Sequence, residues 1–392
     1  MQGLPLNRSS AELPVPSAEA CGHSDRLVGK IRTVIETHDG WISFARYMEM
    51  ALYEPALGYY VAGTAKLGAA GDFVTAAEIS PLFGSTLAGQ VAEIISHTGG
   101  DVLELGAGSG ALAVSMLEEL QALNRLPEWY RILEVSPELR QRQRRLFQQR
   151  LPALSDRIEW ITSLPQRFSG VVVANEVLDA LPVHLLSWRD TGVYERGVAC
   201  KGDAFAWQER RLDPGALRDA AAQLQIEAPY RSELSLAGPA LVRTLAGVLE
   251  RGALFWVDYG FGRREYYHPQ RDSGTLMCHY RHRAHDEPFL FPGLQDITAH
   301  VDFTAVAEAG MDAGLDLIGY TTQAQFLLNG GIADRLARTP AAQAAEYLPV
   351  AAGVQKLVSP AEMGELFKVI ALGRGVVPSL TGFKSGDKRR LL

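Results

Sequence analysis

Residues 101–110 read DVLELGAGSG, and this stretch decides the fold. The apolar letters of 101–105 predict a short buried strand, and ALAVSMLEELQAL (111–123) predicts the helix that follows it. Gly106, Gly108 and Gly110 lie between them, because glycine allows a sharp bend and a close approach of ligand to backbone. With Ala111 the stretch also satisfies the dinucleotide fingerprint GxGxx(G/A). A tight turn that only packs a helix on a strand remains the alternative.

The alternation of strand and helix continues along the chain. Short runs rich in Val, Ile and Leu predict further strands, at 130–136, 157–164, 170–183, 253–260, 315–322 and 366–375. Helical patterns such as PELRQRQRRLFQQRL (137–151) separate the first of these runs. The chain is therefore predicted to be an α/β protein with a Rossmann-like, doubly wound and mostly parallel sheet.

The other segments surround this core. Residues 55–75 are rich in glycine and small residues and predict a loop, whereas 185–212 alternate apolar and polar letters and predict an antiparallel insertion. Residues 262–303 are irregular, and a loop of that length is usually functional. The predicted organisation is a disordered tail (1–25), an N-terminal helical region with a loop over the ligand site (26–97), the first half of the core (98–183), an antiparallel and helical insertion (184–250), the second half of the core with a substrate lid (251–375), and a C-terminal tail (376–392).

Composition and charge limit the classes of partner. The net charge of -7 disfavours a nucleic-acid partner, and no apolar stretch reaches the ~20 residues that span a bilayer, so we expect no membrane insertion. The N-terminal residues lack the apolar core of a signal peptide, and a cytoplasmic location is expected. The three cysteines are scattered, and the histidines of HYRHRAH (279–285) match no standard zinc spacing, so no metal site is expected.

Two acidic residues help to identify the ligand. Glu104 lies inside an apolar strand just before Gly106, where it would repel a pyrophosphate and suit the cationic S-adenosylmethionine (SAM). Glu134 ends the next strand, where a carboxylate can bind ribose hydroxyls of either SAM or NAD. Val135 follows it, and Ser163 and Leu164 close the third strand near the expected adenine edge; a plain loop role for Ser163 is equally open.

Several motifs together carry a resemblance to a known family. The stretch ELGAGSG resembles motif I of class I SAM-dependent methyltransferases. The wider chain resembles the MidA-like branch of that superfamily, which includes a mitochondrial complex I assembly factor with protein arginine methyltransferase activity. The motifs of this resemblance are YEPALGYY, GDFVTAAEISPLFG, ANEVLDALPV, VDYG, FPGLQDITAHVDF, QAQFLLNGGI and MGELFKVI. The chain departs from the family pattern at Ala76-Ala77 and at Ala107, where relatives often have proline.

The resemblance implies a fold and a cofactor. It implies a seven-stranded sheet whose last strand runs antiparallel between its neighbours. It also implies SAM as cofactor and a GDFVT segment that folds over it, with Gly71 close to the ligand and Thr75 bonded to its methionine end. Ala107, within the glycine turn, belongs to the expected cofactor site. An ordinary turn is the alternative for GDFVT.

The polar residues of ANEVLDALP are the candidates for the chemistry. Asn175, Glu176 and Asp179 follow the fourth strand, at the edge of the sheet where the cofactor is expected. Asn175 is expected to contact the cofactor. A carboxylate pair can orient a protonated guanidinium and stabilise its charge, so Glu176 and Asp179 are the predicted catalytic residues. A strand-end carboxylate with bonded partners and a helix cap are the structural alternatives for them.

The resemblance implies a protein arginine methyltransferase. The expected partner is an acceptor protein, for which a subunit of a respiratory complex is one candidate. Asp258 and Tyr259, at the end of the fifth strand, either line the acceptor pocket or pack, and Arg231 and Glu233 are weaker candidates from the insertion. Three other functions stay open: an NAD-dependent oxidoreductase, a non-catalytic SAM-binding assembly factor, and a small-molecule methyltransferase.

Overall fold

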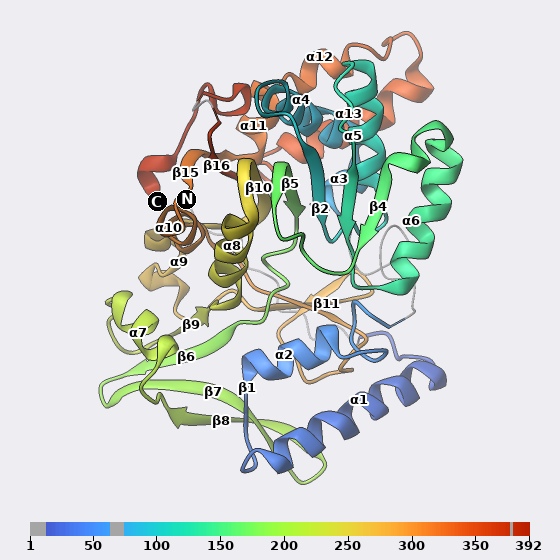
Figure 1. The fold of residues 1–392 in the computed structure, drawn as a ribbon. Helices are drawn as coiled ribbons and strands as arrows, with labels where there is room; N and C mark the ends of the chain where they lie inside the picture. Colours follow the sequence, from blue (N-terminus) through green and yellow to red (C-terminus); the bar gives the residue numbers. More distant parts are fainter. Residues whose placement is uncertain (1–12, 63–73, 377–378) are drawn as a thin grey trace.

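The computed structural model describes residues 13–62, 74–376 and 379–392 (Figure 1). Its main sheet follows the order β15-β16-β10-β5-β2-β3-β4, and β14 adds a short pairing at the end of β10. The strands of the main sheet are β2 (Asp101–Leu105), β3 (Tyr130–Leu133), β4 (Ile158–Ile161), β5 (Phe168–Asn175), β10 (Leu249–Phe261), β14 (Val301–Asp302), β15 (Asp316–Thr322) and β16 (Phe367–Arg374).

The strand directions confirm the predicted sheet. Strands β10, β5, β2, β3 and β4 pair in parallel, so their carboxyl ends meet at one edge. Strand β16 lies between β10 and β15 and runs antiparallel to both, as the family resemblance implied. Residues 171–174 of β5 are buried without interruption, which is typical of a parallel strand covered on both faces.

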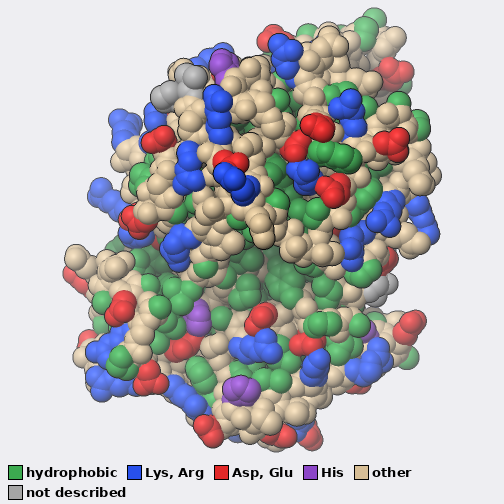
Figure 2. Space-filling model, in the orientation of Figure 1, with side chains coloured by type: hydrophobic (Ala, Val, Ile, Leu, Met, Phe, Trp, Pro, Cys, Tyr) green, Lys and Arg blue, Asp and Glu red, His purple; other side chains and the backbone are tan. Residues whose placement is uncertain are grey.

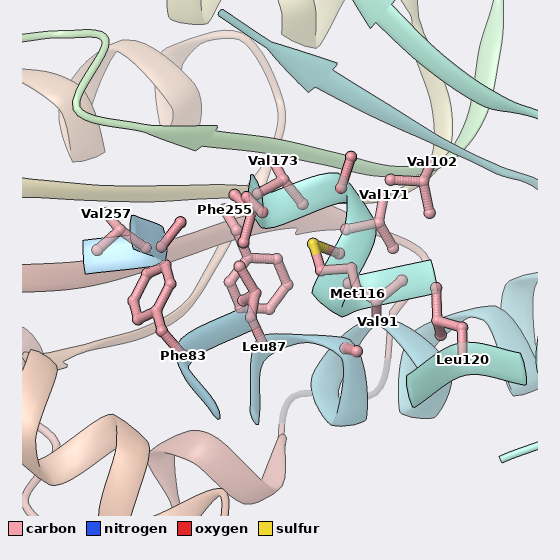
Figure 3. Packing of buried hydrophobic residues seen from close by; sticks show 14 of the residues in the cluster. Phe83, Leu87, Val91, Val102, Met116, Leu120, Val171, Val173, Phe255 and Val257 are labelled. Atoms are coloured by element: carbon pink, nitrogen blue, oxygen red, sulfur yellow. The ribbon is translucent and has the colours of Figure 1, made fainter. Parts of the chain in front are cut away.

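Helices cover both faces of this sheet and give the core its two halves. On one face α4 (Pro81–Thr98) and α5 (Ala111–Ala122) pack against the strands, and Figure 3 shows Phe83 and Leu87 of α4 beside Val257 and Phe255 of β10. On the other face α8 (Ala237–Val248) and α10 (Phe303–Asp312) bury Val242 and Phe303 against the same strands. This two-sided burial holds the carboxyl edge of the sheet in place.

A second, smaller layer lies below that edge in Figure 1. Its sheet follows the order β1-β7-β6-β9, with β8 paired to β7, and confirms the predicted antiparallel insertion. Helices α1 and α2 pack on this sheet, so Leu27, Tyr47 and Val198 share one hydrophobic cluster. A third sheet, β12-β11-β13, contributes Cys278 to that cluster. An N-terminal segment and two internal segments that are far apart in the sequence therefore form one layer.

The remaining elements have the following bounds. The helices are α1 (Ala18–Thr37), α2 (Phe44–Tyr53), α3 (Ala76–Ile79), α6 (Pro137–Arg150), α7 (Ala216–Gln223), α9 (Arg263–Tyr266), α11 (Gln323–Asn329), α12 (Ile332–Leu336) and α13 (Ala344–Val358). The strands are β1 (Ile42–Ser43), β6 (His184–Arg189), β7 (Gly192–Lys201), β8 (Ala204–Arg211), β9 (Tyr230–Leu234), β11 (Met277–Tyr280), β12 (Arg283–His285) and β13 (Asp296–Thr298). None of the helices in the described ranges is long and apolar enough to cross a bilayer.

The structure corrects the predicted N-terminal tail over residues 18–25. These residues form the start of α1, where the Ser17 hydroxyl accepts the Ala20 N–H at 3.2 Å. Ser24 is buried and donates to the Pro292 carbonyl at 2.9 Å. An N-cap and a distant partner thus stabilise a helix that the polar composition did not reveal. Residues 1–12 of the predicted tail lie outside the described residues.

Two further boundaries differ from those predicted. Helix α8 was expected in the insertion, yet Val242 and Leu245 pack against the main sheet, so α8 belongs to the core. The segment expected to be an irregular lid, 262–303, instead contains α9, the small sheet and β14, and Ile297 is fully buried there. Long-range packing determines both the place of α8 and the structure of 262–303, and local sequence patterns do not reveal such packing.

The C-terminal segment also belongs to the folded core. The ring of Phe383 lies 5.4 Å from that of Phe326 and 6.4 Å from that of Phe255. Because this ring is buried, Phe383→Ala should lower the free energy of unfolding by about 3 kcal/mol, measured by urea denaturation. Leu391→Ala, in the same segment but 54% exposed, is the control and should change it by less than about 0.5 kcal/mol. Equal effects of the two changes would contradict this packing.

Candidate functional site

The glycine turn at the end of β2 has the left-handed backbone that its residues allow. The φ angles are +61° at Gly106, +54° at Gly108 and +88° at Gly110, and side chains other than glycine rarely adopt them. A Cβ atom on Gly110 would lie 3.3 Å from Gln143 and 3.4 Å from Phe147. Gly106 is exposed, whereas Ala107 is buried. The turn therefore presents bare backbone at the carboxyl edge of the sheet.

Glu104 lies buried beneath this turn. Its Oε2 accepts the hydroxyl of Tyr130 at 2.7 Å, from the neighbouring strand β3. Burial raises the pKa of Glu104 to about 7, and nearby Glu134 adds to the rise although the Tyr130 bond opposes it. A carboxyl group in this state favours a cationic ligand, because a nearby positive charge restores its ionised form.

Glu134 and the glycine turn are joined by a residue that sequence reasoning missed. Gln143 of α6 is fully buried, and its amide nitrogen donates to the Gly108 carbonyl at 2.8 Å and to Glu134 Oε2 at 3.3 Å. Its amide oxygen accepts the Trp160 indole N–H at 2.8 Å, and the Ser136 N–H donates to Glu134 Oε1 at 2.9 Å. Gln143 thus fixes the turn and the carboxylate relative to each other. In the sequence, only its position four residues before Phe147 indicates that it lies on the buried face of α6.

The other predicted cofactor residues lie along the same edge. Val135 is 59% exposed directly after Glu134, and Ser163 and Leu164 follow β4, with Ser163 exposed and Leu164 half-buried. Thr75 caps α3, and its N–H donates to Glu78 at 3.4 Å. Gly71 lies outside the described residues.

Glu176 follows β5 in a strained conformation. Its φ of +54° is rare for a residue with a side chain, and such strain is often found at functional sites. Its Oε1 accepts the Asn175 side-chain N–H at 3.0 Å and the Ala76 N–H at 3.3 Å. A proline at Ala76, the residue type expected in this region, would lack that donor. Burial, with Asp179 nearby, raises the pKa of Glu176 to about 8.

Two residues at the end of β10 hold the turn that carries the predicted catalytic residues. One oxygen of Asp258 accepts the backbone N–H groups of Val177, Leu178 and Asp179, at 3.2, 2.9 and 3.3 Å. The Tyr259 hydroxyl donates to Asp179 Oδ2 at 2.6 Å. Asp258 is therefore part of the site's scaffold, and Tyr259 orients a carboxylate. The sequence analysis left open whether these two residues line the acceptor pocket or pack.

Three carboxyl groups consequently share one small region. Glu176, Asp179 and Asp258 lie at the carboxyl ends of β5 and β10. Burial raises the pKa of Asp179 to about 6 and that of Asp258 well above its usual value, and the Asp258 pKa is raised further by the other two carboxyl groups. Asp179 Oδ1 is buried and has no hydrogen-bond partner within the described part of the chain. Such a cluster can bind a cation and take up a proton.

The second layer closes this region from below. The Tyr53 hydroxyl donates to the Ala180 carbonyl at 3.1 Å, and its ring stacks on Tyr60 with 5.5 Å between centroids. The Tyr60 hydroxyl donates to Asp296 at 2.8 Å, and the Ala299 N–H donates to the Asp179 carbonyl at 3.0 Å. Figure 2 shows hydrophobic side chains gathered in the recess between the two halves of the molecule.

The remaining candidates do not join the carboxylate cluster. Glu233 is buried and accepts the N–H groups of Thr275 and Leu276 at 2.9 Å, so it links the insertion to the small sheet. Arg231 is exposed on β9. No group of three or more His, Cys, Asp or Glu in the described ranges is arranged to hold a metal ion.

Comparisons with known proteins agree with this geometry. A family model described as "Putative S-adenosyl-L-methionine-dependent methyltransferase" matches residues 86–321. The mitochondrial protein arginine methyltransferase NDUFAF7 homolog of Drosophila melanogaster is 30% identical, over 96% of this chain and 91% of that protein. The mitochondrial protein arginine methyltransferase NDUFAF7 of Danio rerio is 29% identical, over 85% of this chain and 83% of that protein.

A solved structure is more similar still. The crystal structure of a Burkholderia thailandensis protein bound to S-adenosyl-homocysteine has a TM-score of 0.94 and 49% identity, over 97% of this chain and 100% of that one. These findings favour SAM over the dinucleotide that the glycine fingerprint alone left open. SAM is therefore the cofactor, and the chain belongs to the family of S-adenosyl-L-methionine-dependent methyltransferases.

Proposed function

We propose that this methyltransferase transfers the methyl group of SAM to an arginine side chain of an acceptor protein. The observation that carries the proposal is the cluster of Glu176, Asp179 and Asp258 at the carboxyl edge of the sheet, where one Asp179 oxygen has no hydrogen-bond partner among the described residues. A guanidinium is a permanent cation with donors that match carboxylates. The names of the curated relatives support the same acceptor class.

The residues along the edge fit the cofactor. The exposed backbone of Gly106 leaves room for a nucleoside, and Glu134 has lone pairs left for ribose hydroxyls. Glu104 supplies negative charge beneath the turn. We assign the nucleoside to Glu134 and Val135, and the positively charged end of SAM to the side of Glu104. When bound, SAM supplies an electrophilic methyl group on a sulfonium.

The carboxylates have separable roles in this mechanism. Asp179, held by Tyr259, accepts N–H bonds from the guanidinium and orients one of its terminal nitrogens. Glu176 takes the proton that this nitrogen loses as its bond to the methyl group forms. Asp258 keeps the turn between them fixed by its three backbone bonds. The identity of the acceptor protein and the cytoplasmic location stay predictions.

Gly106→Val should weaken SAM binding at least about tenfold, because a branched side chain at φ +61° strains the turn and fills the space above it. Isothermal titration calorimetry with SAM is the measurement. Gly202→Val is the matched control: its φ is +60°, it lies in the β7–β8 hairpin, and a Cβ added there would meet no atom of the described residues within 4 Å. The control should lose similar stability and keep its affinity. If both variants lose SAM binding, the loss comes from misfolding, and the role of Gly106 in cofactor binding is refuted.

Glu176→Gln should lower kcat about 100-fold and leave the affinity for SAM within about threefold, because the amide keeps the size of the side chain but cannot take a proton. The assay incubates a cell lysate with isotopically labelled SAM and locates the label by mass spectrometry. The wild-type protein and the Glu227→Gln control, which alters an exposed glutamate, should label protein arginine. Label in the low-mass fraction would indicate a small-molecule methyltransferase. No label at all would favour the non-catalytic assembly factor.

The raised pKa of Glu176 predicts a pH profile. In the free enzyme this carboxyl group is protonated at neutral pH and ionises as the pH rises through about 8. The guanidinium stays charged over this range, so kcat/KM should rise about tenfold per pH unit below that value and level off above it. Initial rates across this range measure the profile, and Glu176→Gln should flatten it. A wild-type profile that is flat below pH 8 would contradict the assignment of the base.

A further inference from the structure

A cavity of about 440 Å³ lies beside the carboxylate cluster. It separates the insertion from the core: α7 and β9 line one side, and α8, α10 and residues 300–302 line the other. Leu178, the residue before Asp179, forms part of its wall. His300 also lines it, and the His300 ring lies 5.0 Å from the ring of Tyr259, which holds Asp179. The cavity therefore adjoins the turn that carries Asp179.

One ring nitrogen of His300 has no hydrogen-bond partner among the described residues. Its ring stacks on Phe261 at 5.3 Å, and its Nδ1 is buried with no hydrogen-bond partner among the residues described. Burial, with Arg271 and Lys368 nearby, lowers the pKa of His300 to about 4, so the ring is neutral at physiological pH. Buried polar atoms are nearly always bonded, and this nitrogen belongs to a residue that lines the cavity.

The wall of the cavity is largely apolar, whereas its rim is charged. Leu178, Val183, Leu234, Val301 and Val306 make much of the wall apolar.

The charged lining residues are mainly acidic. They comprise Asp219, Asp302, Glu308 and Asp312 against Arg243 and Arg263. Arg263 is committed to Asp302 and Glu308, whereas Asp219, Asp312 and Arg243 are exposed, so two acids face one cation at the rim. A side chain with an apolar stem and a cationic head fits both features, and lysine and arginine have this form.

We propose that this cavity is an acceptor subsite that binds a second lysine or arginine side chain of the polypeptide whose arginine is methylated. The inference rests on the proposed function and refines it: the enzyme selects arginines that have another cationic residue nearby in the acceptor. The apolar wall receives the methylene stem, and Asp219 and Asp312 attract the charge.

The test uses synthetic peptides that contain one arginine in an alanine–glycine background. One series places a single lysine at successive flanking positions, and matched series place norleucine or glutamate there. Binding is measured by fluorescence anisotropy in the presence of S-adenosyl-homocysteine, and methyl transfer is measured separately with labelled SAM. At one flanking position the lysine peptide should bind about tenfold more tightly than the norleucine peptide.

Two variants locate the effect in the cavity. Asp219→Asn combined with Asp312→Asn should reduce the lysine preference by about threefold to tenfold and leave the norleucine peptide unchanged. Ala216→Trp, at an exposed lining position, should fill the cavity and remove the preference. Asp213→Asn alters an exposed acid that does not line the cavity and is the control.

The outcomes separate this inference from the proposed function. Glu176→Gln should keep the binding preference and lose transfer. A lysine preference that depends on Asp219 and Asp312, with no transfer to any peptide, would support the subsite and count against arginine methylation. Equal binding of all three series, or a preference that survives both cavity variants, would overturn the subsite even if arginine is methylated.

Discussion

The three backbone hydrogen bonds to the carboxylate of Asp258 are the interaction on which the acceptor half of the site depends. They join the end of β10 to the turn after β5, so the turn follows a left-handed path at Glu176. Parallel pairing of β5 with β10 brings these ends together, and helices on both faces keep them there. An apolar residue at 258 would leave three N–H groups buried without an acceptor. The pairing of β5 with β10 therefore determines where the carboxylates lie.

Much of the fold was predictable because parallel strands have a distinctive composition. The runs at 101–105, 170–175 and 253–260 are buried on both faces, so their apolar letters continue without alternation. The position of β16 between β10 and β15 came only from family resemblance, since strand order leaves no local signal. The tail and α8 were misjudged for a related reason: Ser24 and Val242 find their partners far away in the sequence.

The residues of the site also divide into those that the sequence identifies and those that only the fold reveals. Closely spaced glycines after a strand indicate a sharp turn, so Gly106 was identifiable from the sequence. A carboxylate in an apolar strand costs free energy unless it has a ligand or a hydrogen-bond partner, so Glu104 was identifiable too. Gln143 was not, because a glutamine within a polar helix is ordinary until the fold shows that its amide joins the glycine turn to Glu134. Tyr53 and Tyr60 come from the N-terminal region and reach the carboxyl edge only through the second layer.

The place of β16 in the sheet has a consequence for biosynthesis. This strand is encoded close to the end of the chain, yet it separates β10 from β15 and pairs with both along nearly its whole length. While the ribosome is still translating, both neighbours have an open edge, and open edges attract other nascent chains. Closure of the sheet therefore waits until β16 has been synthesised, and premature termination before residue 367 releases a polypeptide with two unsatisfied strand edges.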